Sequence, residues 1–389
     1  MSSTIRRSVH ATQPQGVSFV ELFFDLVFLF AVTQITALTA HELTAIGLLR
    51  SVLIGWLIWW AWTQFTWTLN PADTTELTVR IVTLTATGAA FIMAASVPRA
   101  FTDEAIWFAL PYVFVRLLGL GLQLRVESEH ESDDHSIIYR WVSLSLIGLA
   151  LVLVGAFVDP QVRSIVWLLA IAADFLAAAI AGRGTAWDVD PAHMSERHGL
   201  FVITALGESL IVAAAAVAEA PLSIALVLAV GASVLVACLL WWTYFGWLKD
   251  ALEHRFAAAD PRRRGSLARD AFSLAHFPLI GGIVGFAVAV EETVLHPAEP
   301  MSGTLLISLG IGVALFVGCS ALSLRLLGGP VLVARLMGLV LMAVGLAVVW
   351  VVAGSPAVAF GVVAAVLLGI VLVEARVVMT GPAPMPIEG

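Results

Sequence analysis

The sequence predicts an all-α membrane protein with about twelve transmembrane helices, and three observations support this fold class. Of the 389 residues, 60% are hydrophobic and 12% are charged, against about 25% charged residues in ordinary soluble domains. The mean hydropathy is +0.97. The apolar residues form stretches of about 20, the length of a helix that crosses a bilayer. This composition excludes a cytosolic enzyme and an extracellular module.

Twelve apolar spans follow one another along the chain. They cover residues 18–39, 46–69, 80–98, 106–126, 137–158, 162–181, 198–218, 222–247, 268–290, 302–324, 331–353 and 356–378. Gly354, Ser355 and Pro356 separate the last two spans, and such residues are typical of points where a helix ends and the chain reverses. The two cysteines, Cys238 and Cys319, lie inside apolar spans. We therefore expect them to be small buried apolar residues and not a disulfide pair.

The spans are expected to form two similarly oriented six-helix halves. Aromatic residues end the second span of each half, from Trp59 to Trp67 and from Trp241 to Trp247. An ordinary aromatic belt at the membrane surface is the alternative explanation of each cluster. Six helices per half is an even number, so both halves would share one orientation. The expected organisation is an N-terminal segment 1–17, a first half 18–181, a linker 182–197, a second half 198–378 and a disordered tail 379–389.

The basic residues predict the orientation in the membrane. Of the 20 lysines and arginines, three lie on the side opposite the N-terminus, at Arg50, Arg99 and Arg163, and Arg116 lies inside a span. The others fall on the side of the N-terminus. Because basic residues accumulate on the cytoplasmic side, we expect a multi-pass protein of the inner (plasma) membrane with both termini in the cytoplasm.

Two groups of histidines and carboxylates could be metal sites. One is the loop 127–135, and the other consists of His193, Glu196 and His198 before the seventh span. Both groups contain residue types that bind divalent metals. A solvated loop and the start of a helix at the membrane interface are the simpler explanations. We therefore expect no metal and no cofactor.

Charged side chains inside apolar spans are costly and require a partner or a function. Glu21 and Asp25 are four residues apart and share one face of the first span. Asp25 is the deeper of the two, and we expect it to face protein or water. The candidate residues of an ion or substrate pathway are Glu21, Asp25, Arg116, Asp174, Glu208 and His276.

Two interpretations of these candidate residues remain open. In the first, they pair inside the bundle, with Arg116 neutralising one of the acids, for example Asp25. In the second, they line a polar pathway for protons, ions or a small solute. Three deep acids against one fixed base leave a surplus of negative charge, which favours a proton or another cation over an anion.

Two motifs resemble those of the bacterial low temperature requirement protein A family. The first covers residues 20–28, read as VELFFDLVF, and continues as AVTQ at 31–34; the second covers 196–201 and 206–209, read as ERHGLF and LGES. His198 stands where many members have an aromatic residue. The resemblance implies an integral membrane protein linked to growth at low temperature and leaves its molecular activity open. The motif residues are Phe24, Asp25, Glu196, Arg197, Gly207 and Glu208.

The first span is also similar to the Phe-Ser-Asp motif in the first helix of a family of potassium channels built from six-helix repeats. The similarity covers Phe24 to Phe28 and implies a pore lined by this helix. Phe24 stands in place of the serine, and Ile203 stands where the second half would need an aspartate. A shared pore is therefore a hypothesis for the first span.

The expected function is a transporter or channel that moves a cation, a proton or a small solute along a polar pathway between helices. One alternative is a membrane-embedded enzyme acting on lipid, and another is a non-transporting scaffold or sensor in cold or stress adaptation. Ala45 replaces the second histidine of a zinc-protease motif that begins at His41, so we expect no catalytic site. The expected partners are the lipid bilayer and the transported ion or solute, and not a nucleic acid. A polar lumen would favour a transporter or channel. A metal site would favour an enzyme, and an interior in which all charges are paired would favour a scaffold or sensor.

Overall fold

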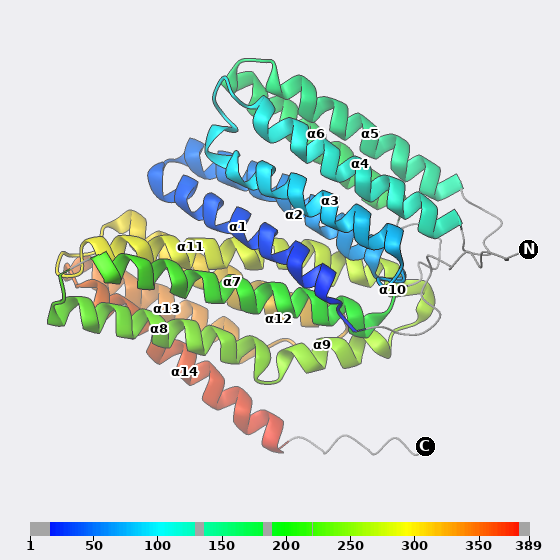
Figure 1. Ribbon diagram of the computed structural model, residues 1–389. Coiled ribbons are helices and arrows are strands. Elements are labelled where there is room, and N and C mark those ends of the chain that lie inside the picture. Colours follow the sequence, from blue (N-terminus) through cyan, green and yellow to red (C-terminus); the bar gives the residue numbers. More distant parts are fainter. Residues whose placement is uncertain (1–15, 129–135, 182–188, 220, 381–389) are drawn as a thin grey trace, which may run out of the picture.

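The protein is a bundle of helices that run roughly along one common direction (Figure 1). The computed structural model describes residues 16–128, 136–181, 189–219 and 221–380. The long helices are α1 (Phe19–His41), α2 (Ala45–Leu69), α3 (Leu77–Ala95), α4 (Ile106–Ser128), α5 (Ser136–Ala156), α6 (Pro160–Ala181), α7 (Pro191–Glu219), α8 (Ile224–Phe245), α11 (Ala275–Leu295), α12 (Gly303–Leu326), α13 (Val333–Val351) and α14 (Pro356–Thr380). Shorter helices are η1 (Val97–Arg99), α9 (Leu248–Ala257), α10 (Pro261–Leu267) and the π-helical segment η2 (Ala268–Leu274).

Each of the twelve predicted spans falls on one of the long helices, which confirms the fold class. Eleven segments of the described chain are long and apolar enough to cross a membrane. The remaining predicted span corresponds to α7, whose first turns are rich in polar and charged residues. α7 begins at Pro191, earlier than expected, so part of the predicted linker is helical. Its start is stabilised by Asp190, whose carboxylate accepts hydrogen bonds from the backbone amides of Ala192 and His193.

The same pattern of helix contacts occurs twice along the chain. α1 packs against α2 and α3, α2 against α4 and α6, α3 against α4, α4 against α5, and α5 against α6. α7 packs in the same way against α8 and α11, α8 against α12 and α14, α11 against α12, α12 against α13, and α13 against α14. Such a pattern is expected of a repeat. The division into two halves stays a prediction, which a superposition of the two sets of helices would test.

α1 and α7 lie side by side in the middle of the bundle, between α2–α6 and α8–α14 (Figure 1). Glu21 bonds to Arg197, and further along both helices Thr33 bonds to Glu208. Because the two contacts follow the same order on each helix, α1 and α7 run parallel. We call the end of the bundle at which both begin the N-terminal face, and the other end the opposite face.

The structure corrects the expectation for the cysteines. Cys238 is exposed on the surface of the bundle and Cys319 is partly exposed, and both are free thiols. They face outward from their helices because apolar residues of a membrane span can contact lipid as well as the protein core.

Candidate functional site

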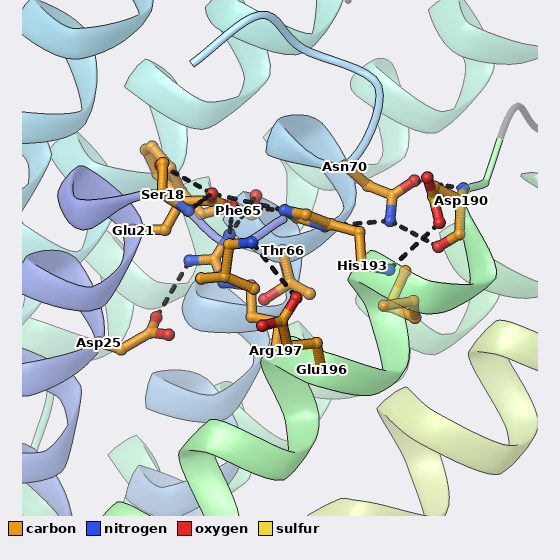
Figure 2. Close-up of polar contacts among 12 residues, drawn as sticks. Ser18, Glu21, Asp25, Phe65, Thr66, Asn70, Asp190, His193, Glu196 and Arg197 are labelled. Carbon is orange, nitrogen blue, oxygen red and sulfur yellow. Dashed lines mark hydrogen bonds and ion pairs between the residues drawn. The ribbon is translucent and has the colours of Figure 1, made fainter. Parts of the chain in front are cut away.

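A cluster of buried charged side chains joins α1 to α7 near the N-terminal face (Figure 2). Arg197 of α7 lies between two carboxylates of α1: one guanidinium nitrogen is 2.9 Å from Oε1 of Glu21, and the other is 3.0 Å from Oδ1 of Asp25. Glu21 and Arg197 are fully buried, and Asp25 is 6% exposed, which confirms that Asp25 faces the interior. We call Glu21, Asp25, His193 and Arg197 the carboxylate cluster.

The start of α1 fixes the position of Glu21. Ser18 is the N-cap residue of α1, and Glu21 is the third residue of the helix. The backbone amide and the hydroxyl of Ser18 both donate to Oε2 of Glu21, over 2.9 and 2.8 Å. This is the capping-box arrangement, in which an acid in the first turn binds back to the N-cap. The remaining oxygen of Glu21 is therefore free to bind residues of α7.

His193 adds a hydrogen bond to the cluster from the first turn of α7. Its Nε2 lies 3.1 Å from Oε1 of Glu21, and its Nδ1 lies 3.3 Å from Nδ2 of Asn70. An amide nitrogen can only donate, so Nδ1 of His193 is assigned as the acceptor and Nε2 as the N–H that donates to Glu21. Asn70 is held in turn by Asp190, whose backbone amide donates to Oδ1 of Asn70. The imidazole carries no charge in this assigned tautomer.

Asp25 is bound from a third helix by Trp62 of α2. The indole N–H of Trp62 donates to Oδ1 of Asp25 over 2.7 Å. Oδ2 of Asp25 is buried and has no hydrogen-bond partner in the described part of the chain. Two carboxylates, one guanidinium and a neutral imidazole give the cluster one surplus negative charge. Two acids that share one cation at short range are an arrangement that can take up a proton.

Arg116 of α4 forms a separate ion pair with Asp174 of α6. The two guanidinium nitrogens lie 3.1 and 3.3 Å from the two carboxylate oxygens, and the hydroxyl of Tyr112 accepts a further bond at 3.0 Å. Arg116 neutralises an acid, as the first interpretation predicted. The prediction that this acid could be Asp25 was wrong. Asp25 is bound by Arg197 instead, because α7 and not α4 packs against α1 at that level.

Glu208 and His276 lie in two further places. Oε1 of Glu208 accepts a hydrogen bond of 2.6 Å from the hydroxyl of Thr33. The Nδ1–H of His276 is assigned as the donor to the carbonyl of Ala271 at 3.0 Å, and its Nε2 as the acceptor from the hydroxyl of Tyr244 at 2.8 Å. The six candidate residues therefore lie in four separate places of the described structure and do not meet in one polar path.

The ninth predicted span contains an irregular turn, the π-helical segment η2, which ends just before the turn that contains Pro278. A proline lacks the backbone N–H that would bind the carbonyl four residues earlier, and it disturbs the preceding turn. The wider turns of η2 free the carbonyl of Ser273, which accepts a hydrogen bond of 2.7 Å from the indole of Trp59.

Trp62, which binds Asp25, also lines an apolar cavity of about 470 Å³. Its walls come from α1, α2, α11 and α12, and Phe201 of α7 contributes to its inner end together with Trp59 and Trp62. The segment Glu42–Ala45, between α1 and α2, lines the end toward the opposite face. The indole of Trp62 thus lines the cavity, while its N–H binds the carboxylate cluster.

A family model described as bacterial low temperature requirement A protein (LtrA) matches residues 16–373. The chain belongs to this family. An uncharacterized protein of Rhizobium meliloti (strain 1021) is 25% identical over 329 residues, which cover 82% of this chain and 76% of the relative. No solved structure matches the chain.

The two LtrA motifs meet in the carboxylate cluster. The first motif supplies Glu21 and Asp25, and the second supplies Arg197. Phe24 packs beneath the guanidinium of Arg197, with the ring centroid 6.0 Å away. Glu196 accepts a hydrogen bond from the backbone amide of Val17, next to the N-cap of α1. The motif positions that are far apart in the sequence are therefore close together where α1 contacts α7.

Two features of this LtrA protein are not predicted by the sequence. The span boundaries place Arg197 among the basic residues outside the membrane, yet it is fully buried. Arg335 of α13 and Glu374 of α14 form another buried pair, with bonds of 2.7 and 3.0 Å, and Trp247 donates to Glu374 over 2.9 Å. An acid within the last apolar span is the signal that could have identified Glu374.

The metal-site interpretation has no support in the described residues. His193 binds Glu21, Glu196 binds the backbone of Val17, and the Nδ1 of His198 binds the carbonyl of Met194. No group of three or more His, Cys, Asp or Glu residues in the described ranges is arranged to hold a metal ion. Most of the loop 127–135 lies outside those ranges.

Proposed function

We propose that this LtrA family protein is a proton-coupled transporter of a small solute. In this proposal the carboxylate cluster takes up and releases the proton, and the apolar cavity holds the solute. The observation that carries the proposal is the position of Trp62, whose ring lines the cavity and whose N–H binds Asp25. A change in the charge of Asp25 alters this hydrogen bond and therefore the wall of the cavity.

The charge of the cluster supports a proton as the coupling ion. Glu21 and Asp25 share the single guanidinium of Arg197, and His193 contributes a neutral donor. One proton brings the net charge of the cluster to zero. A buried surplus charge is unfavourable in a low-dielectric interior. Binding of a proton removes this charge and is therefore favoured.

The location of the cluster supports a link between proton uptake and movement. Arg197 connects α7 to α1, and these are the first helices of the two predicted halves. Protonation of a carboxylate removes its charge and weakens the ion pair that holds α1 to α7. In transporters built from repeats, the two halves rock against each other around a central site. The cavity, which ends at Trp59, Trp62 and Phe201, would then open toward the N-terminal face.

The predicted orientation assigns a direction to this cycle. Both termini are predicted to lie in the cytoplasm. The N-terminal face, and with it the carboxylate cluster, is then on the cytoplasmic side of the inner membrane. The cavity then extends toward the outside of that membrane. This arrangement corresponds to a transporter closed on its cytoplasmic side.

A non-transporting sensor is the second candidate function. It is favoured by the pairs Arg116–Asp174 and Arg335–Glu374, each of which is buried and electrically neutral. Neutral pairs of this kind stabilise a bundle and supply no surplus charge for an ion. The carboxylate cluster, with its two acids on one guanidinium, is the feature that favours transport.

The proposal is tested by proton flux through the purified protein. Proteoliposomes that contain the pH dye pyranine receive an acid step outside, and the rate of internal acidification is recorded. We expect the wild type to exceed protein-free liposomes and Asp25→Asn to match them. Asparagine keeps the shape of aspartate and an oxygen for Trp62, but it lacks the charge that binds the proton.

The matched control is Asp250→Asn, the same change at an exposed carboxylate of α9, which should leave the flux unchanged. Wild-type flux no higher than that of empty liposomes would contradict the proposal. Undiminished flux in Asp25→Asn would do the same.

A further inference from the structure

The wall of the apolar cavity includes exposed side chains of α2 and α12. Leu48 and Val52 of α2 and Ile307 and Ile311 of α12 all line the cavity. Each of these four side chains is also between 47% and 62% exposed on the surface of the molecule. Exposed apolar side chains in the spanning part of a membrane bundle contact lipid chains. At these side chains the cavity therefore borders the hydrocarbon of the bilayer.

Among the described residues, no charged group that could bind an ion lines the interior of the cavity. Glu42 lies at the end toward the opposite face and is paired with Arg50 at 3.2 Å. The hydroxyls of Thr39 and Ser308 already donate to backbone carbonyls. The hydroxyl of Ser51 is buried and has no partner in the described structure. The lining thus offers apolar contact and, at Ser51, a buried hydroxyl that is free to bind an occupant.

Gly281 keeps part of this space free of protein atoms. It lies inside α11 and lines the cavity, and a Cβ atom built on it would meet nothing within 4 Å. Glycine inside a helix is less favourable than alanine by about 1 kcal/mol. No close contact with a neighbouring helix requires glycine at this position. The missing side chain leaves room in the cavity for an occupant.

We infer that the cavity binds a membrane-dissolved amphiphile, with its hydrocarbon part between α1, α2, α11 and α12. Its polar group lies at the end of the cavity near Glu42 and Arg50, within reach of a hydrogen bond to Ser51. The volume falls within the range of about 300–1,000 Å³ that is usual for small-molecule sites. This inference rests on the proposed function and deepens it, because it names the substrate class of the transporter.

The test uses the uncharged dye N-phenyl-1-naphthylamine, whose binding is measured in nanodiscs by energy transfer from tryptophan. Trp59 and Trp62 line the cavity, so a bound dye lies close to two donors. We expect a saturable signal in the wild type. Gly281→Leu should weaken the saturable binding by about tenfold or more, because the new side chain occupies the space of the dye.

The matched control is Gly88→Leu. Gly88 lies inside α3, is exposed away from the cavity, and a Cβ atom placed on it would likewise meet nothing within 4 Å. Both substitutions replace a helical glycine by leucine in open space, so neither should impair folding. Equal binding in Gly281→Leu and the wild type would overturn the inference, as would the lack of a saturable signal in the wild type.

A second measurement distinguishes the two sources of the hydrocarbon chain. If the occupant is a bilayer lipid, native mass spectrometry of the purified protein should detect retained phospholipid in the wild type and less of it in Gly281→Leu. Displacement of the dye by dodecanol without retained phospholipid identifies a smaller amphiphile. Dye binding together with absent proton flux would refute the proposed function alone. Proton flux without saturable dye binding would refute this inference alone.

Discussion

Arg116 and Arg197 are both buried arginines in membrane helices, but their surroundings differ by one carboxylate. Arg116 faces the single acid Asp174, and the pair is neutral. Arg197 faces both Glu21 and Asp25, and the group keeps a negative charge when His193 is neutral. The first arrangement is that of a structural ion pair. The second can change its charge by binding a proton, which is the property that a coupling site needs.

We predict that Arg116→Met strongly destabilises the protein. Loss of one partner of a buried ion pair leaves the other charge uncompensated and costs about 3–5 kcal/mol. The free energy of unfolding in detergent micelles should fall accordingly, and Arg116→Met combined with Asp174→Leu should restore much of it. Arg99→Met is the control, because Arg99 pairs with Glu104 on the surface, where such pairs contribute about 0–1 kcal/mol. Equal effects of Arg116→Met and Arg99→Met would show that the buried pair is not structural.

We predict that Trp62→Phe separates solute binding from proton transfer. Phenylalanine keeps an aromatic ring at the cavity wall but cannot donate to Asp25. Dye binding should persist, and proton flux should fall toward that of Asp25→Asn. Trp59→Phe is the matched control: Trp59 also lines the cavity, but its N–H binds the carbonyl of Ser273. Equal flux in the two variants would argue against Trp62 as the link.

Among the helices, α11 combines two glycines with opposite roles in adjacent positions. A Cβ atom at Gly282 would lie 2.5 Å from the carbonyl oxygen of Gly312 on α12 and 2.8 Å from the amide nitrogen of Phe316. Small residues let the backbones of membrane helices approach closely, and Gly282 is required for this contact. Gly281 faces the cavity and touches nothing there. The same residue type therefore packs one face of α11 and leaves the other face open.

We predict opposite effects of the two alanine substitutions on stability. Gly282→Ala should force α11 away from α12 and lower the free energy of unfolding by about 1–3 kcal/mol. Gly281→Ala should be neutral or stabilising by up to about 1 kcal/mol, because alanine favours the helix. Thermal unfolding of both variants in the same detergent measures the difference. A Gly281→Ala variant as unstable as Gly282→Ala would contradict this account of α11.

For the whole molecule, the sequence predicts helices well and contacts between helices poorly. Hydrophobic length is a local property, so the twelve spans can be placed on the chain. The deep position of Asp25 follows from its place in the first span. The partner of Asp25 could not be predicted, because Arg197 lies 172 residues away and its burial depends on how α7 packs. The pairing of Glu374 escapes prediction for the same reason, since its partner Arg335 is on another helix.

We predict that both ends of the chain lie on the cytoplasmic side of the membrane. An even number of spans places both termini on the same side, and the distribution of basic residues predicts that this side is the cytoplasm. Reporter fusions after Gly381 and within residues 127–135 should both show a cytoplasmic location. In the structure, α1 begins and α14 ends toward the same side of the bundle (Figure 1). A periplasmic signal at either fusion would refute the twelve-span topology.

The central claim is that the carboxylate cluster and the apolar cavity are coupled through Trp62. Coupling between two sites is reciprocal, so a proton that changes solute affinity must itself be bound more or less tightly when solute is present. The groups that face Asp25 in this exchange are Glu21 on α1 and Arg197 on α7, with His193 one step further along the hydrogen bonds to Glu21. Loss of the charge at Asp25 should therefore remove the pH dependence of solute binding in the cavity.

The affinity of the dye, measured over a range of pH in the wild type and in Asp25→Asn, tests this claim most directly. We expect the dissociation constant of the wild type to change with pH and that of Asp25→Asn to stay nearly constant. A wild-type affinity that is the same at every pH would contradict the account, and so would a pH dependence that Asp25→Asn retains in full.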